Sequence, residues 1–213
     1  MKKLIFAAMA AIFMAPALSS AAVLDFTTGK AGAGGTIVDT GTGDVLGMDI
    51  FIDTLVATET SADGVYNVDG ALVCATGSCA ALSFDTAAGT FSIVGSVPGL
   101  VGPTTLLSGT IDSFTFTTTP AGLATFYATG TDTKAEGLLS SLGIAPGTVF
   151  DFAGFNIGFS PVPCGAGRTC YTATSADFLN NSGVGGEAVP EPTTLVLLGG
   201  GLLGLVRARR RSA

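Results

Sequence analysis

Short apolar runs separated by turn-forming residues limit most strongly what this chain can fold into. Between residues 22 and 188, Thr, Val, Ile and Phe fill the runs, and Gly, Asn, Asp or Pro interrupt them about every ten positions. This spacing is typical of short strands joined by tight turns, and no period of about 20–50 residues repeats as it would in a solenoid. The sequence therefore predicts an all-β fold, a β-sandwich of roughly 8–10 short strands.

Alternating apolar residues also locate a hairpin and two irregularities. Residues 82–93 show the strand pattern on both sides of a turn at 85–89, which predicts a β-hairpin. The period of two slips by one residue near 112–113 and again near 153–154. A slip of this kind predicts a β-bulge at each point, because one extra residue reverses the faces of all that follow.

Two further elements are expected from local patterns. Residues 134–142 are the one segment that favours a helix, and Gly143 would cap its end. Residues 48–53 favour a strand in which one face is apolar and the other acidic. The apolar face would carry Met48, Ile50 and Ile52, and the acidic face Asp49 and Asp53.

The charged residues exclude several classes of function. The chain contains no His, so Ser-His-Asp catalysis, Cys-His catalysis and histidine metal sites are excluded. Residues 22–189 contain 15 acidic and 3 basic residues, which gives them a net charge of −12. Because so acidic a body repels a phosphate backbone, we expect no nucleic-acid partner.

Four cysteines point to disulfides rather than to a metal. They are Cys74, Cys79, Cys164 and Cys170. Four cysteines allow three pairings, and the two short glycine-containing loops favour 74 with 79 and 164 with 170. Zinc is the alternative, but these spacings differ from the usual C-x2-C, and an exported chain meets oxidising conditions. We therefore expect no metal and no cofactor.

The N-terminus has the pattern of a secretory signal peptide. Lys2 and Lys3 precede an apolar stretch over residues 4–18, and small residues follow. We expect a signal peptidase to cut between Ala21 and Ala22. The alternative is an uncleaved membrane anchor.

The C-terminus combines a short motif, an apolar segment and a basic cluster. The motif is Val189, Pro190, Glu191 and Pro192, and the uncharged residues 193–206 follow it. A helix of that length spans about 21 Å, which is short of the ~30 Å hydrocarbon core and suits a brief membrane anchor. The basic cluster, which positive charge would hold on the cytoplasmic side, is Arg207, Arg209, Arg210 and Arg211.

This order of features resembles the PEP-CTERM sorting tail of Gram-negative bacteria, which is also catalogued as an ice-binding protein C-terminal domain. The similarity rests on residues 189–192, 195–206 and 207–211. It implies recognition by an exosortase, a membrane cysteine transpeptidase, and an envelope or extracellular destination, often in species that make exopolysaccharide. It implies nothing about the body, because many unrelated bodies carry this tail.

The body contains three further candidate sites. Thr-rich runs at 115–119 and 129–133 could bind ice, but Thr is common on exposed strands. Residues 63–70 carry oxygen ligands at alternate positions but fail the calcium-loop pattern at both ends, which favours an ordinary turn. A hydrolase would need two carboxylates. The candidates are Asp49, Asp53, Asp63, Asp69, Asp112 and Asp151.

The sequence thus predicts three parts: a signal peptide (1–21), a secreted β-sandwich (22–188) and a sorting and anchor segment with one hydrophobic helix (189–213). We expect an exported, non-catalytic envelope or matrix protein. It would be anchored transiently in the inner membrane, then placed at the cell surface or outside. A carbohydrate-binding sandwich that associates with exopolysaccharide is the alternative, and a carboxylate-pair hydrolase is a third hypothesis.

Overall fold

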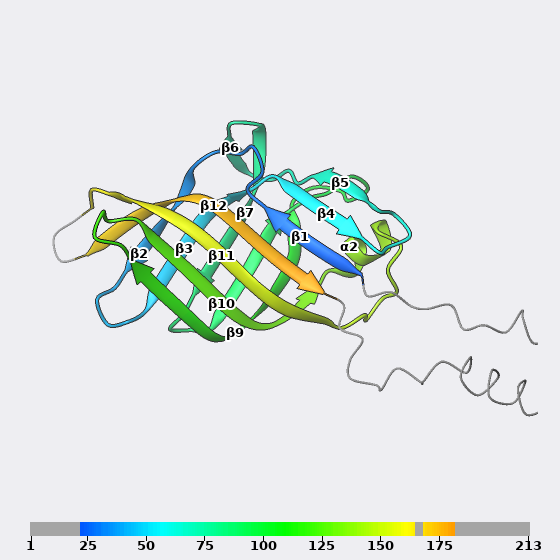
Figure 1. Cartoon of the computed structure of the whole chain (residues 1–213). Coiled ribbons are helices and arrows are strands. Elements are labelled where there is room, and N and C mark those ends of the chain that lie inside the picture. The colour runs from blue at the N-terminus through cyan, green and yellow to red at the C-terminus, as the bar shows by residue number, and fades with distance from the viewer. Residues whose placement is uncertain (1–21, 165–167, 182–213) are drawn as a thin grey trace, which may run out of the picture. The chain divides into compact units, whose positions relative to one another are not determined.

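A computed structural model describes residues 22–164 and 168–181 (Figure 1). The regular secondary structure of this part is almost entirely strand, with one short helix, α2 (Glu136–Ser141). The strands are β1 (Val23–Thr27), β2 (Gly34–Asp39), β3 (Val45–Ile52), β4 (Thr54–Thr58), β5 (Gly64–Asn67), β6 (Leu72–Cys74), β7 (Gly77–Asp85), β8 (Thr90–Gly95), β9 (Thr104–Thr118), β10 (Ala124–Lys134), β11 (Phe150–Val162) and β12 (Thr169–Asn181).

Eight of these strands close into a barrel, in the order β11-β10-β9-β8-β7-β3-β2-β12. The closing contact is the antiparallel pairing of β12 with β11 along one edge. Along its other edge, β12 pairs first with β2 and then, in its second half, with β1. β4 and β5 extend the sheet beyond β1. The all-β prediction is confirmed, but the chain forms a closed barrel and not the expected sandwich.

Long strands explain the closure. β9 to β12 are 15, 11, 13 and 13 residues long, whereas the sequence pattern predicted short strands throughout. Strands of this length must coil and tilt, and bulges supply the bends that let a sheet meet itself. A closed ring also pairs the edges that a sandwich would leave open.

The two predicted bulges are present. Thr129 pairs with Ser113 and Gly130 with Ile111, so Asp112 is the extra residue of β9. In the β11–β12 pair, the register shifts between Phe152 and Gly154, which leaves the residue between them without a partner. The slips in the alternation of apolar residues therefore predicted the two bulges correctly.

A third bulge, in β3, overturns one expectation. The β3–β7 register shifts between Gly47 and Ile50, and Asp49 adopts a φ of 56°. The extra residue turns Met48 outward, where it is 40% exposed, while Ile50 and Ile52 are buried. Met48 therefore does not share their face. The sequence could not reveal this bulge, because apolar and acidic residues alternate through it without a slip in the period.

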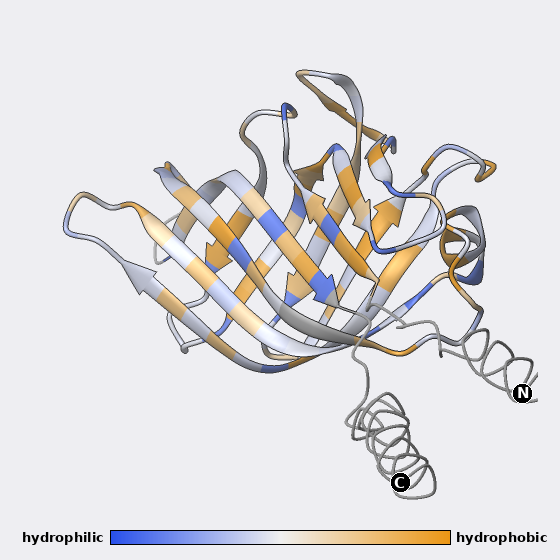
Figure 2. Ribbon diagram, turned by 45° about the vertical axis from the view of Figure 1, so that its right-hand side comes forward, coloured by the Kyte–Doolittle hydropathy of each residue, from blue (hydrophilic) through white to orange (hydrophobic). Residues whose placement is uncertain are grey.

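Aromatic side chains fill the barrel. Phe155 of β11 lies with its ring centroid 5.4 Å from Phe84, 5.1 Å from Phe126 and 5.5 Å from Phe178, so one side chain joins strands from opposite parts of the ring. These pairs adopt the tilted, offset or edge arrangements that aromatic rings prefer. Figure 2 shows the matching alternation of apolar and polar residues along the strands. The interior is thus a packed core.

The helix α2 lies between β10 and β11 and adds Leu138 and Leu139 to the core. It begins later than predicted, because Lys134 is the last residue of β10. Its end is as expected: Gly143 has a φ of 65°, its N–H donates to the Ser140 carbonyl, and the Ile144 N–H donates to the Leu139 carbonyl. This pair of bonds is a Schellman motif, which favours glycine.

Both disulfides have the pairing that the short loops favoured. Cys74 is bonded to Cys79 across the β6–β7 hairpin, and Cys164 to Cys170 across the β11–β12 connection. The predicted hairpin at 82–93 is also present, with Leu82 opposite Ile93. Each disulfide closes a local loop, so it restrains that loop and not the barrel as a whole.

Candidate functional site

The two terminal sorting segments predicted from the sequence, 1–21 and 189–213, lie outside the described residues. The expected cleavage point adjoins them: Ala22 is buried, and β1 begins at Val23. Within residues 22–164 and 168–181, no helix is long and apolar enough to cross a membrane.

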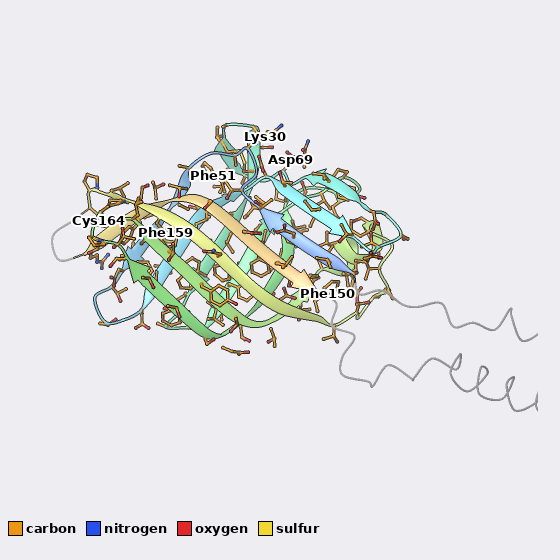
Figure 3. All side chains as sticks on the ribbon, in the orientation of Figure 1. Lys30, Phe51, Asp69, Phe150, Phe159 and Cys164 are labelled. Atoms are coloured by element: carbon orange, nitrogen blue, oxygen red, sulfur yellow. A yellow bond between two sulfur atoms is a disulfide. The ribbon has the colours of Figure 1, made fainter. Side chains whose placement is uncertain are left out.

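A hollow of about 550 Å³, which we call the polar depression, is the best candidate for a ligand site in the body. It lies where the loop after β1, the β3–β4 junction, β5 and the β6–β7 hairpin meet, and Lys30 and Asp69 mark this edge in Figure 3. Its polar lining includes Lys30, Asp53, Thr54, Asn67, Asp69 and Ser78.

Asp53 in this depression serves the local backbone. It was expected on the acidic face of the strand at 48–53, but it lies at the junction between β3 and β4 and is only 6% exposed. Its Oδ2 accepts a bond from the Lys30 N–H at 3.0 Å, and its Oδ1 accepts one from the Thr54 hydroxyl at 2.7 Å. Both carboxylate oxygens are therefore engaged in holding two turns together.

Asp69 is engaged in a similar way. Its Oδ1 accepts a bond from the Ser78 hydroxyl at 2.9 Å, and its backbone pairs with Ser96 in an isolated bridge. Half of the candidate calcium segment, residues 63–70, is strand β5, paired with β4, so the segment does not form such a loop. Among the described residues, no three metal-ligating side chains gather at one point.

The remaining carboxylate candidates lie apart from the depression. Asp49 belongs to the bulge of β3 and Asp112 to that of β9. Asp63 caps a turn, accepting bonds from the Thr60 N–H and hydroxyl. Asp151 lies in β11, but its side chain is outside the described part. Of the five candidates whose side chains the structure describes, only Asp53 and Asp69 line this hollow.

A carboxylate pair that the sequence analysis missed lies on β1 and β12. The register places Asp25 opposite Leu179 and Thr27 opposite Asp177, so Asp25 and Asp177 are diagonal neighbours on the outer face. Partial burial, then the hydrogen bond and the negative charge of Asp177, raise the pKa of Asp25 to about 7. No local signal could reveal this pair, because its members are far apart in sequence.

This pair predicts a pH-dependent stability. The folded state holds the Asp25 proton more tightly than the unfolded state does, so the free energy of unfolding should fall as the pH rises from about 4 to about 7. In Asp25→Asn, urea unfolding at several pH values should show a smaller fall than in wild type. The exposed carboxylate variant Asp112→Asn should keep the wild-type slope. An unchanged slope in Asp25→Asn would contradict the assignment.

Hydroxyl groups on the outer face of β9 and β10 pair with one another. Thr110 and Thr131 lie 3.0 Å apart at their Oγ1 atoms, and Ser113 Oγ lies 2.7 Å from Thr129 Oγ1. Cross-strand hydroxyl pairs of this kind stabilise a sheet. The bulge at Asp112 separates the two pairs, so the Thr-rich runs form no long regular array.

The one comparison that gives a match concerns the C-terminal segment. A family model described as the PEP-CTERM protein-sorting motif matches residues 188–211. The chain carries a PEP-CTERM sorting motif. No curated protein and no solved structure matches the chain.

The PEP-CTERM match covers every residue that carried the resemblance in the sequence: Val189 to Pro192, the apolar segment and Arg207 to Arg211. The motif implies processing by an exosortase, and it indicates export and transient membrane association in Gram-negative bacteria. The match covers no residue of the barrel, so it assigns no activity to residues 22–187.

Proposed function

We propose that the barrel is a non-catalytic component of the cell envelope or extracellular matrix, delivered by an exosortase through the PEP-CTERM motif. The observation that carries the proposal is the sorting motif at residues 188–211, in a chain whose barrel is filled by its own side chains. A filled barrel offers bulk and an outer surface rather than an internal reaction chamber.

The carboxylates of the polar depression support a non-catalytic role. A glycosidase needs one carboxyl group to give up a proton and another to attack or to activate water, at a separation of about 5–9.5 Å. Asp53 has both oxygens engaged by Lys30 and Thr54, and Asp69 accepts a bond from Ser78. Groups so engaged stabilise turns and are poorly placed for proton transfer to a substrate.

Three features of the barrel domain are compatible with a location outside the cytoplasm. Eight strands pair in a ring, which leaves those strands no open edge on which other chains could add. Two disulfides close short loops, as is common in exported domains. The acidic surface also favours solubility at high local concentration.

Cell fractionation tests this proposal. In a Gram-negative host that contains the matching exosortase, the barrel should be found at the cell surface or in the medium. In an isogenic strain that lacks the exosortase, it should remain with the inner membrane. The same distribution in both strains would refute delivery by the motif.

The polar depression favours one second candidate, a saccharide-binding function. Amide, hydroxyl, ammonium and carboxylate groups meet there, and these are groups that bind sugar hydroxyls. No aromatic residue is present in its described lining, and Tyr171 is buried elsewhere, so a sugar ring would have no side chain to stack on. Any binding at this place would depend on hydrogen bonds.

Co-sedimentation with the host's purified exopolysaccharide separates the two candidates. Saccharide binding predicts that wild type sediments with the polymer and that Asn67→Ala loses most of this association. Asn156→Ala, an exposed amide variant on β11, is the matched control. If wild type and Asn67→Ala both stay in the supernatant, the saccharide candidate fails and the leading proposal is unaffected.

A further inference from the structure

A buried lysine, aspartate and asparagine meet inside the barrel, at the ends of β10 and β12. Lys134 Nζ lies 2.7 Å from Asp132 Oδ1 and 3.1 Å from Asn180 Oδ1. It also lies 3.9 Å from the ring centroid of Phe150, the first residue of β11. The side chains of Lys134 and Asp132 are fully buried, and Asn180 is as well. We call these three polar residues the lysine cluster.

An ordinary salt bridge does not account for the lysine cluster. Asp132 Oδ2 and Asn180 Nδ2 are both buried and have no hydrogen-bond partner in the described part of the chain. Each such unsatisfied group lowers the stability of the fold, and burying the two charges lowers it further. Asp132 and Asn180 both accept hydrogen bonds from this ammonium group, and an unsatisfied atom on each of them calls for a chemical explanation.

We propose that Lys134 and Asn180 form an intramolecular isopeptide bond, with Asp132 as the catalytic acid and base. The bond that forms joins Lys134 Nζ to Asn180 Cγ, and the bond that breaks joins Asn180 Cγ to Nδ2. Of the three protons on the lysine ammonium, one stays on the new amide and two leave with Nδ2 as ammonium. No oxidant or cofactor is needed, because nothing is oxidised or reduced.

Burial in the barrel favours the protonation states of Lys134 and Asp132 that the reaction needs. Attack requires a neutral amine, and burial lowers the pKa of Lys134, against the opposing effect of Asp132. Burial likewise raises the pKa of Asp132, against the opposing effect of Lys134. Both changes favour transfer of one proton from Nζ to Asp132, which leaves a lone pair on the nitrogen and an acid beside it.

Asp132 can then complete the exchange. As an acid it can hydrogen-bond to the amide and polarise it, and it can deliver its proton to the departing Nδ2. Phe150 covers the amine, and the apolar core around the cluster keeps out the water that would compete as a nucleophile. Fixed neighbours in a folded core have a very high effective concentration, so even an amide becomes a feasible target.

The product would remove two of the features that make the lysine cluster costly. The ammonium charge disappears, and so does the unpartnered Nδ2. A covalent bond would tie β10 to β12 across β11, between residues 46 apart in sequence. β12 is the last described strand before the sorting motif, so the bond would secure the strand that connects the barrel to its tail.

Mass spectrometry of the exported protein tests the proposal. After reduction and alkylation of the cysteines, wild type should be lighter than its sequence predicts by one ammonia molecule. Cleavage before aspartates places Lys134 in residues 132–150 and Asn180 in a peptide that begins at 177. These two peptides should be recovered as one cross-linked species.

Matched variants assign the roles. Lys134→Arg keeps the charge but cannot form the bond, and Asp132→Asn keeps the shape but cannot shuttle the proton. Both should lose the cross-link and regain the full mass. Cross-linking in Asp132→Asn at the wild-type level would refute the role of Asp132. If wild type itself has the full mass and the two peptides separate, the cluster is an ion pair and the proposal is wrong, whether or not the variants fold.

Discussion

Replacing Phe155 by Ala should lower the free energy of unfolding by about 3–5 kcal/mol, which is a large part of the ~5–15 kcal/mol typical of a whole domain. The side chain is 1% exposed and contacts rings from β7, β10 and β12. Removing it would leave a cavity in the middle of the barrel, and the closed ring restricts how far the strands can move to fill that cavity.

Urea unfolding followed by circular dichroism measures this effect. Val101→Ala is the control, because Val101 is fully exposed and its loss should change stability by less than about 0.5 kcal/mol. A loss below about 1.5 kcal/mol in Phe155→Ala would mean that the interior is not packed as described.

Deleting residues 190–213 should have the largest effect on location. Without the motif, the apolar segment and the arginines, the chain has no tail for an exosortase to recognise and no C-terminal anchor. We expect nearly all of the truncated protein to appear as soluble periplasmic material in the host that sorts the full chain. Processing and placement identical to those of the full chain would contradict the role of the motif.

The arginine cluster allows a finer version of this test. Changing Arg209, Arg210 and Arg211 to Ser removes the charges that hold the C-terminus in the cytoplasm, so inner-membrane retention should weaken. Changing the same three residues to Lys keeps the charge and should preserve retention. Equal retention in both triple variants would show that charge is not what holds the tail.

Local features of the fold could be predicted because each leaves a local trace in the sequence. The hairpin at 82–93 shows alternation on both sides of a turn, and the slip at Asp112 marks a bulge. Gly143 is the residue that a left-handed helix end favours. The two short cysteine loops could each close without help from the rest of the chain.

Closure of the barrel could not be predicted, because it depends on pairing between distant segments. Val38 of β2 lies opposite Cys170 of β12, and β12 also pairs with β11. A period of two reports which residues face inward, but it is the same for a sandwich and for a barrel. The prediction of two separate sheets failed for this reason.

The same limit applies to the chemistry of the body. Asp25 and Asp177 meet only because β1 lies beside β12, and Lys134 meets Asn180 only because the ring brings β10 near β12. In the sequence the two members of each pair lie far apart, so no local pattern links them. The sorting motif differs, because its function is written in consecutive residues and needs no fold to be recognised.

The C-terminus of the mature protein tests the central claim most directly. Protein collected from the surface or medium of an exosortase-containing host can be digested and its C-terminal peptide sequenced by mass spectrometry. Processing through the PEP-CTERM motif predicts a chain that ends near Pro190 to Pro192 and lacks the cluster from Arg207 to Arg211. Exported protein that still ends at Ala213 would contradict the account.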